Sequence, residues 1–275
     1  MNPVKDWDSY RHHVGTIRRL SSAYSTNLYA DRASVERWSS SGRLQVMTAD
    51  RAVLFRRSDR DFHHLYHVAE DEGALFGALD GLADGTYVTD LVGKGPSFEQ
   101  LRAIHVRAGF LAHTQLCRMG LADTTRAKIA SDPEQAAPEV AKLEHVPEIL
   151  ALLERILDRY SEQIPVLEEL AEAVQYEQLL FARCEGAIAA ILLFEQKGQL
   201  AHLRLWHVES FAQGAGIGRQ LMAAFHTRTS EARRKILWVK ADNRRSIDIY
   251  RHYGFAEDGL LDQIMILNKG KLIDE

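Results

Sequence analysis

The sequence predicts an α+β (mixed α/β) fold in which a mostly antiparallel central sheet is flanked by helices, and it predicts two tandem copies of that fold. Residues 43–121 and 178–268 each read as three consecutive strands, a helix, a strand, a helix and a final strand. The length of 275 residues is comfortable for two domains of roughly 100–200 residues each. The two halves therefore repeat an order of elements and not a strong sequence identity.

The first half begins with a polar segment, 1–40, whose apolar residues recur at helical spacing. Three extended runs follow, separated by short polar turns that favour an antiparallel meander. We expect these strands at 43–49, 51–57 and 62–69, a helix at 71–82, a strand at 86–93, a helix at 97–110 and a strand at 111–121.

Between the halves, residues 122–142 are small and polar and hold two of the six prolines. This composition is typical of a linker, so the expected domains are 1–121 and 143–275. In the second half we expect helices at 146–160 and 164–175, strands at 178–186, 187–198 and 199–210, a helix at 216–232, a strand at 235–241, a helix at 245–255 and a strand at 260–268.

Composition and charge exclude several classes of protein. The formal net charge is −4, so the chain has no broad basic field and nucleic acid is not an expected partner. Residues 1–15 lack the apolar core of a signal peptide, and no window approaches the roughly 18 apolar residues of a membrane span. Cys117 and Cys184 fit buried thiols in a reducing compartment. We therefore expect a cytoplasmic protein with no membrane partner.

The stretch "QGAGIG", residues 213–218, lies between an expected strand and an amphipathic helix. A glycine-rich turn that opens a helix is the layout of an anion site, because the first amides of the helix point outward together and the helix dipole favours negative charge. A P-loop would need Lys and Ser or Thr after the last glycine, where Arg219 and Gln220 stand. A dinucleotide fingerprint would need a third glycine at Arg219.

The same stretch matches the Q/R-x-x-G-x-G/A motif of the GNAT acetyltransferase superfamily, with Gln213, Gly216 and Gly218. Val208 stands five residues before Gln213, as in the usual run of that family. The later stretch "ADNRRSIDIYRHYGF" resembles a second motif of the family, and the resemblance covers roughly residues 140–268 in order. The second half is therefore identified as similar to a GNAT domain.

The resemblance implies acetyl-CoA as co-substrate, with its pyrophosphate on the backbone amides of 214–218. Gln213 would close the loop by hydrogen bonding, Asn243 would bind the pantetheine arm, and Ser246 replaces the alanine that is frequent in the family. The implied cofactor-binding residues are Trp206, Val208, Gln213, Gly214, Ala215, Gly216, Ile217, Gly218, Arg219, Asn243, Ser246 and Tyr250. The histidines have no zinc-like spacing with cysteine, so we expect no metal.

Acyl transfer to an amine needs a base for the amine and an acid for the departing thiolate. Tyr250 is the candidate acid, because a phenol can donate a proton to sulfur. His202, which resembles a histidine of the serotonin acetyltransferase branch, and Glu209 are the rival bases. Strict alternation would place His202 on the same face as Trp206 and Val208, and the reaction could also need neither base. The same alternation assigns His207 to the scaffold, and Tyr253 is expected to point elsewhere on its helix.

The first half is expected to be a degenerate copy that does not bind CoA. Its segment 104–110, "IHVRAGF", echoes 249–255, "IYRHYGF", and places His105 where the second half has Tyr250. The corresponding helix start lacks the glycine motif and instead carries the acidic run 70–72, which would repel a pyrophosphate.

The sequence therefore predicts an acetyl-CoA-dependent N-acetyltransferase that transfers acetyl directly to a primary amine of a small molecule. Two alternatives are left open, a CoA-binding regulatory or interaction module without turnover and a protein N-acetyltransferase. The acceptor amine is not identified by any motif, and the oligomeric state, a homodimer included, is also open.

Overall fold

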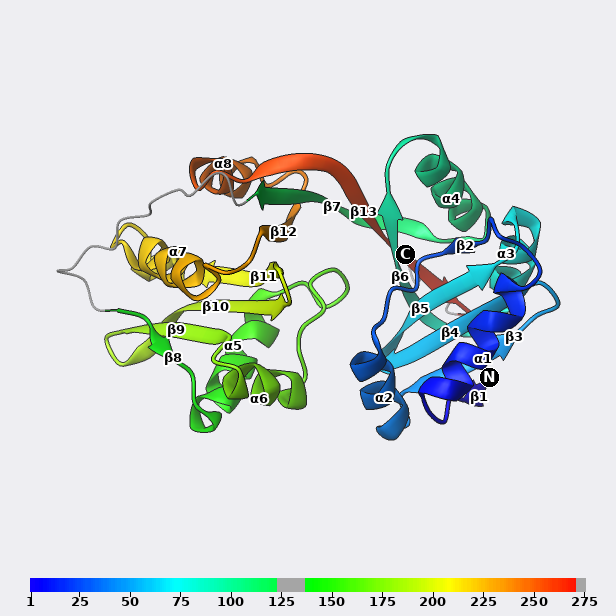
Figure 1. Cartoon of the computed structure of the whole chain (residues 1–275), viewed down its shortest axis with the longest axis horizontal. Coiled ribbons are helices and arrows are strands. Elements are labelled where there is room, and N and C mark those ends of the chain that lie inside the picture. The colour runs from blue at the N-terminus through cyan, green and yellow to red at the C-terminus, as the bar shows by residue number, and fades with distance from the viewer. Residues whose placement is uncertain (123–136, 271–275) are drawn as a thin grey trace. The chain divides into compact units, whose positions relative to one another are not determined.

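The computed structural model describes residues 1–122 and 137–270 and divides into two compact units (Figure 1). The first unit comprises Met1–Leu116 and Leu260–Glu275, and the second comprises Cys117–Gly259. This division differs from the expected domains 1–121 and 143–275, because the segment after Gly259 belongs with the first unit. Most of the expected linker 122–142 lies outside the described residues. Its described end forms a short strand, β8 (Glu139–Val140).

The expected helical segment 1–40 contains two helices, each begun by an aspartate that caps its first turn. The side chain of Asp6 accepts a hydrogen bond from the Ser9 amide at 2.7 Å, and Asp31 accepts one from the Ser34 amide at 2.9 Å. The helices are α1 (Trp7–Arg18) and α2 (Arg32–Ser40), and the same segment holds the short strands β1 (Asn2–Pro3) and β2 (Ser25–Thr26).

The rest of the first unit follows the predicted order of elements. These are β3 (Leu44–Thr48), β4 (Ala52–Asp59), β5 (Phe62–Ala69), α3 (Glu72–Asp80), β6 (Gly85–Gly93), α4 (Gly95–Arg107) and β7 (Leu111–Ala122). Strands β3, β4 and β5 form the expected antiparallel meander, and β6 pairs with β5 in parallel.

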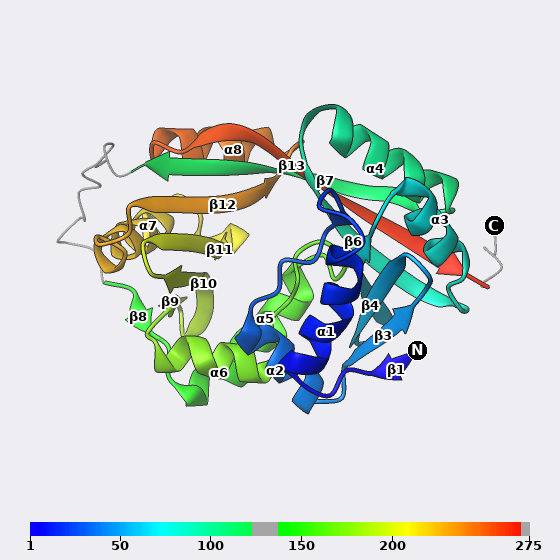
Figure 2. The same cartoon turned by 45° about the vertical axis from the view of Figure 1, so that its right-hand side comes forward.

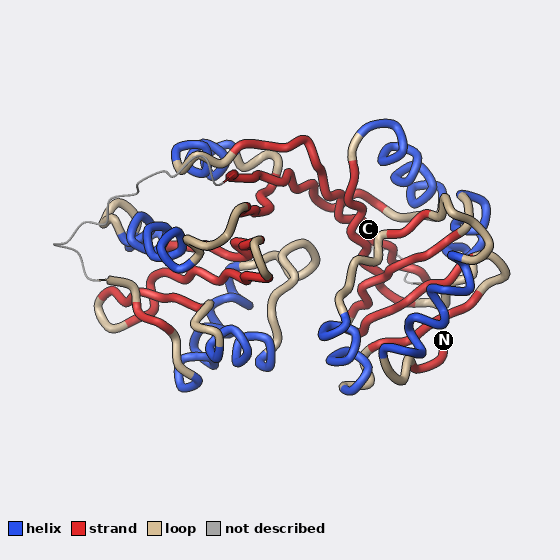
Figure 3. The backbone as a smooth tube through the Cα atoms, viewed as in Figure 1, coloured by secondary structure: helices blue, strands red, loops and turns tan. Residues whose placement is uncertain are grey.

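Helices cover both faces of the first unit's sheet. Val53 and Phe55 of β4 pack in a core with residues of α1 and α2, whereas their neighbours Ala52 and Leu54 pack in a second core with residues of α3 and α4. Because side chains alternate along a strand, the two pairs of helices lie on opposite faces. Figure 3 shows the helices on either side of the strands.

The second unit repeats the same order, as predicted. Its elements are a 3-10 turn η1 (Leu143–His145), α5 (Val146–Ile156), α6 (Leu167–Gln175), β9 (Leu179–Cys184), β10 (Ala187–Lys197), β11 (Leu200–Val208), a 3-10 turn η2 (Ser210–Ala212), α7 (Ile217–Arg228), β12 (Arg234–Lys240), α8 (Arg244–His252) and β13 (Ala256–Lys269). Its strands lie in the order β7-β12-β11-β10-β9-β8. Figure 2 shows β10 and β11 side by side in this unit.

One extra residue in β11 changes which side chains share a face. Leu205 pairs with Leu193 of β10, but the next residue of β10, Phe194, pairs with Leu203, so Arg204 is left between the two pairs. Leu193 packs in the core formed with α5 and α6, whereas the ring of Phe194 lies 5.4 Å from that of Phe225 in α7. The two faces of this sheet are therefore an α5–α6 face and an α7 face.

Strands β7 and β13 are the two strands whose residues are divided between the units. The end of β13, from Leu261 to Lys269, pairs antiparallel with β6 and supplies Met265 and Leu267 to a core of the first unit. The end of β7 lies beside β12 in the sheet of the second unit. The sheet of the first unit thus includes the end of β13 from the second half of the sequence. The sheet of the second unit includes the end of β7 from the first half.

Candidate active site

The two parallel strands at the centre of the second unit diverge halfway along their length. β11 pairs with β12 from Leu200 opposite Arg234 to Leu203 opposite Leu237, and the pairing ends there. β11 nevertheless continues to Val208 and β12 continues to Lys240. Within the described residues, the final part of β11 therefore has a strand partner only on its β10 side.

The amides on the other side of β11 are directed toward this divergence. The amide of Glu209 donates to the carbonyl of Ala189, which follows the pairing of β11 with β10. Because successive amides of a strand point to opposite sides, the N–H groups of Val208 and Trp206 point away from β10. Two backbone donors are thus aimed into the space that β12 leaves, as the family resemblance implied.

The glycine-rich loop starts α7 in a conformation that leaves its first turn uncovered. Gly216 is the N-cap with φ 77°, a left-handed conformation that suits glycine, and no side chain among the described residues caps the helix. A Cβ on Gly218 would lie 3.3 Å from Cζ2 of Trp206 and 3.3 Å from Cγ2 of Val208. Glycine at 218 therefore lets the helix start approach the divergent strand closely.

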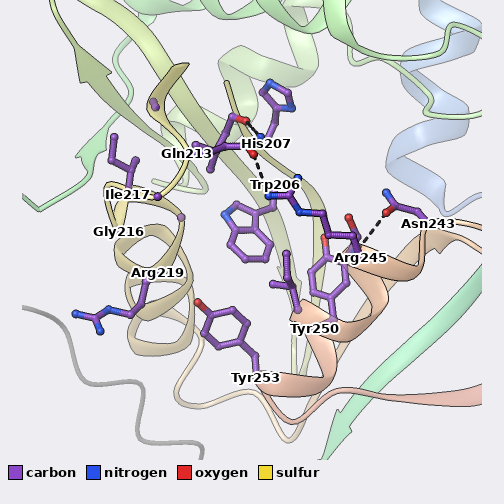
Figure 4. Close-up of a pocket in the computed structure, with 16 residues that line it drawn as sticks. Trp206, His207, Gln213, Gly216, Ile217, Arg219, Asn243, Arg245, Tyr250 and Tyr253 are labelled. Carbon is purple, nitrogen blue, oxygen red and sulfur yellow. Dashed lines mark hydrogen bonds between the residues drawn. The ribbon is translucent and has the colours of Figure 1, made fainter. Parts of the chain in front are cut away.

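Gln213 fastens the loop to the strand, as expected. Its side-chain nitrogen donates to the carbonyl of Val208 at 3.2 Å, and its side-chain oxygen accepts from the Nη2 atom of Arg245 at 3.0 Å. Arg245 comes from the first turn of α8, so this contact joins the loop before α7 to the start of α8 (Figure 4).

A cavity of about 630 Å³ lies at the divergence and along the loop. It is lined by all of the predicted cofactor-binding residues except Ala215, namely Trp206, Val208, Gln213, Gly214, Gly216, Ile217, Gly218, Arg219, Asn243, Ser246 and Tyr250. The sequence reasoning missed His207, Ala212, Arg245, Ile249 and Tyr253, which also line it. Ile249 and Tyr253 lie three and seven residues beyond Ser246, so the helical period of α8 could have indicated both.

Two tyrosines of α8 and one tryptophan form the aromatic wall of the cavity. The ring of Trp206 lies 5.6 Å from that of Tyr250 and 5.8 Å from that of Tyr253. Tyr250 is only 9% exposed, and burial raises the pKa of its hydroxyl above the ordinary value, which keeps it protonated. The expectation that Tyr253 points elsewhere is wrong, because both rings face the same cavity (Figure 4).

Asn243 has a structural contact in addition to its place in the cavity. Its side-chain oxygen accepts a hydrogen bond from the Ser246 amide at 3.1 Å and so caps α8. The cap directs the start of α8 toward the cavity, and the side-chain amide nitrogen of Asn243 is the donor left for a ligand.

The expected face of His202 is wrong because of the extra residue at Arg204. Trp206 and Val208 pair with Leu192 and Ala190 of β10, whereas His202 pairs with Glu195. Residues 190 and 192 of β10 face opposite to residue 195, so His202 lies on the α5–α6 face and Trp206 and Val208 lie on the α7 face. His202 does not line the cavity. Burial and the nearby guanidinium of Arg204 lower the pKa of His202 to about 4.

Glu209, the rival base, lies at the end of β11 and is engaged by two neighbours. Its Oε1 atom lies 2.6 Å from Nη2 of Arg155 in α5 and 3.7 Å from Nε2 of His207. The carboxylate does not line the cavity itself. It stands beside a histidine whose backbone does belong to the cavity wall.

Neither a metal site nor a membrane-crossing helix is found in the part of the chain that the structure describes. In residues 1–122 and 137–270, no three His, Cys, Asp or Glu side chains gather where they could hold a metal ion. No helix within these ranges combines the length and apolar character needed to cross a lipid bilayer.

The first unit has an equivalent strand divergence, but its own chain fills it. β5 pairs with β6 only at His63 opposite Tyr87 and His64 opposite Val88. His67, three residues beyond the last pair, corresponds in position to Trp206. The short strand β2 pairs antiparallel with the end of β5 at this point.

The residue after β2, Asn27, places its side-chain amide between the diverging strands. Its oxygen accepts from the His67 amide at 2.8 Å, and its nitrogen donates to the carbonyl of Leu65 at 3.3 Å, to that of Asp90 at 3.1 Å and to the hydroxyl of Thr89 at 2.9 Å. Asn27 is only 7% exposed. A carboxamide of the chain thus uses the backbone groups that an extended ligand would need.

Other features of the first unit also separate it from the second. Asp71 caps α3 by accepting from the Ala74 amide, and Glu70 and Glu72 flank it, so this helix start is acidic and covered. His105, the counterpart of Tyr250, is fully buried, with its ring 5.3 Å from Phe110. Burial lowers the pKa of His105 to about 4.

Comparison with known protein families identifies the second half. A family model described as "Acetyltransferase (GNAT) domain" matches residues 142–263. These residues therefore form a GNAT acetyltransferase domain, and the family prediction made from the glycine loop and the α8 motif is confirmed. No curated protein matches the sequence significantly.

Solved structures show the fold of the whole chain. A Drosophila protein has a TM-score of 0.58 at 17% identity, with 96% of this chain and 91% of that chain covered. A GCN5-related N-acetyltransferase from Sphaerobacter thermophilus has a TM-score of 0.58 at 13% identity, with 96% and 93% covered. A tandem GNAT protein from the clavulanic acid biosynthesis pathway has a TM-score of 0.57 at 13% identity, with 82% of each chain covered. The predicted tandem GNAT-like fold is confirmed.

Proposed function

We propose that the protein is an acetyl-CoA-dependent N-acetyltransferase that transfers acetyl to a primary amine of a small molecule. The observation that carries this proposal is the end of β11–β12 pairing at Leu203 opposite Leu237, with a cavity that extends from this divergence to the glycine start of α7. A divergence lined by backbone donors suits an extended amide-containing arm, and a helix start without a side-chain cap suits a pyrophosphate.

The residues around the cavity fit such a ligand in shape and in hydrogen bonding. No described side chain makes a capping hydrogen bond at the start of α7, and Gly218 lets this helix start approach Trp206 and Val208 closely. The indole Nε1 of Trp206 is buried and makes no hydrogen bond with any described residue, which is costly unless a ligand or water accepts from it. Arg219 and Arg245 add positive charge to the same wall. Acetyl-CoA would supply the activated acetyl group there.

The chain's own groups supply the remaining chemistry. The backbone N–H of Trp206 would donate to the carbonyl oxygen of the acetyl group and stabilise negative charge that develops on it. The protonated hydroxyl of Tyr250 would give its proton to the departing sulfur. Neither Cys117 nor Cys184 lines the cavity, which favours direct transfer to the amine over a cysteine-bound acetyl group.

The test is release of free thiol from acetyl-CoA in the presence of a panel of small primary amines, amino sugars and peptides. Release with small amines, and its loss in Gly218→Val, would support the proposal. Binding of acetyl-CoA without release for any acceptor would favour a regulatory module instead. Release with peptides only would favour a protein N-acetyltransferase.

A further inference from the structure

His207 differs from His202, the other histidine of β11, in that it lines the cavity. Its backbone lines the cavity between Trp206 and Val208, whereas its side chain belongs to the opposite, α5–α6 face. Figure 4 shows the indole of Trp206 and the imidazole of His207 pointing to opposite sides of the strand. The imidazole of His207 therefore lies on the α5–α6 face of the strand at the position between Trp206 and Val208.

The ring of His207 lies beside the carboxylate of Glu209, an arrangement that suits proton transfer. Its Nε2 atom makes no hydrogen bond within the described residues and lies 3.7 Å from Oε1 of Glu209. The carboxylate favours the tautomer with the proton on Nε2, which leaves the lone pair on Nδ1. The side chain is 33% exposed, so the ring is accessible as well as oriented.

Three charged residues from different elements act on this ring. Glu209 from the end of β11 and Glu162 from the segment between α5 and α6 raise the pKa of His207, whereas Arg155 from α5 lowers it. Burial is the largest influence and brings the pKa of His207 below its ordinary value. The imidazole is therefore mainly neutral at pH 7 and able to accept a proton.

We propose that His207 is the general base of the transfer reaction and that the acceptor amine approaches from the α5–α6 face. This inference rests on the proposed function. The ammonium form of the acceptor gives one proton to Nδ1 of His207. The nitrogen lone pair of the resulting amine then forms the C–N bond to the acetyl carbon while the C–S bond breaks. The thiolate takes the hydroxyl proton of Tyr250, and the nitrogen gives its second proton to solvent, from which the Tyr250 phenolate is reprotonated. The products are the N-acetyl amine, the free thiol and the one proton held by His207.

Glu209 and Arg155 are positioning residues in this arrangement. Arg155 holds Oε1 of Glu209 at 2.6 Å and so limits the pull of the carboxylate on His207. The two neighbours act on the imidazole with opposite sign. Removing each in turn should therefore move the proton affinity of His207 in opposite directions, which a purely structural role would not do.

The experiment measures kcat/KM against pH for the full chain with an amine found active in the thiol-release assay. The wild-type profile should show an acid limb at a pH below the ordinary histidine value of about 6.5, because burial lowers the pKa of His207. His207→Gln should remove this acid limb and lower kcat at neutral pH by about 10²–10⁴-fold, while calorimetry with acetyl-CoA alone shows unchanged affinity. Glu209→Gln should move the limb to lower pH, and Arg155→Met should move it to higher pH.

The matched control is His252→Gln, an exposed histidine of α8 that does not line the cavity, and its profile should equal that of the wild type. An acid limb that survives in His207→Gln, or one that disappears in His202→Gln instead, would overturn the assignment of the base while the proposed function stands. Absence of thiol release by the wild type with every acceptor would overturn the proposed function itself.

Discussion

The backbone N–H of His67 donates a hydrogen bond of 2.8 Å to the side chain of Asn27, at the point where β5 and β6 diverge. Trp206 in the second unit occupies the corresponding position beside an open cavity. The divergence of two parallel strands thus has a different role in each unit. In the first unit the backbone groups at the divergence form hydrogen bonds with Asn27. In the second unit they face a cavity that a ligand can enter.

Replacing Asn27 with Ala should lower the stability of the first unit. The substitution removes the Asn27 partner of the His67 amide and of the Asp90 carbonyl, whereas the Leu65 carbonyl keeps its hydrogen bond from the Thr89 hydroxyl. Each unsatisfied buried group costs about 1–3 kcal/mol. Urea unfolding should show a loss within or above this range. The exposed Asn2 provides the control, since Asn2→Ala should change the free energy of unfolding by less than about 0.5 kcal/mol.

We predict that calorimetry will find one acetyl-CoA site per chain. The divergence in the first unit is occupied by Asn27, and the start of α3 is capped by Asp71. Gly218→Val should weaken binding by about 10-fold or more, because its side chain would press on Trp206 and Val208. Gly77→Val, at an open position of α3, should leave affinity unchanged. Two sites of similar affinity would contradict the view that the first unit is a non-binding copy.

Tyr250→Phe should lower turnover by about 10²–10⁴-fold and leave acetyl-CoA affinity near that of the wild type. The ring, which packs 5.6 Å from Trp206, is retained, and only the proton donor is removed. Single-turnover kinetics should be used so that chemistry limits the rate. Tyr176→Phe, at an exposed tyrosine, is the control. Equal turnover for Tyr250→Phe and the wild type would make Tyr250 a packing residue.

Asp262→Asn should make the first unit more stable, increasingly so as pH rises. Burial, and then the neighbouring Asp90, raise the pKa of Asp262 well above its ordinary value. The folded state therefore holds a proton that the unfolded chain releases above about pH 4, so stability falls as pH rises from there through the raised pKa. The asparagine has no such proton to lose.

Thermal unfolding of Asp262→Asn and wild type at several pH values should show a difference that grows from pH 4 toward neutrality. The exposed Asp50 is a suitable control, because Asp50→Asn should give a nearly constant small difference. A difference for Asp262→Asn that does not depend on pH would contradict the raised pKa.

The order of elements and the glycine loop could be predicted from the sequence because both depend on local patterns. Apolar runs separated by the turn signals EG and KG indicate β9 to β11, and the turn before α7 requires glycine at 216 for its positive φ. The bulge at Arg204 could not be predicted in this way. It is a mismatch in pairing between β10 and β11, and the residues of β11 taken alone do not reveal it. That single residue reversed the expected face of His202.

Long-range relationships were also beyond a local reading. Asn27 lies in an unremarkable polar segment, and its importance depends on β5 and β6, which lie far along the chain. The contact of Arg245 with Gln213 joins two separate motifs. The division of the chain into two compact units differs from the expected domains, because strands β7 and β13 each have residues in both units.

The place of β13 in the first unit has a consequence for how the protein is made. On the ribosome the chain emerges from its N-terminus, and N-terminal domains generally fold first. Here β6 must wait for Leu261–Lys269, among the last residues translated, before it gains its second neighbour. At roughly 5–20 residues per second, the interval is on the order of ten seconds. During that time the nascent first unit exposes an unpaired strand edge, the kind of surface that chaperones and other nascent chains recognise.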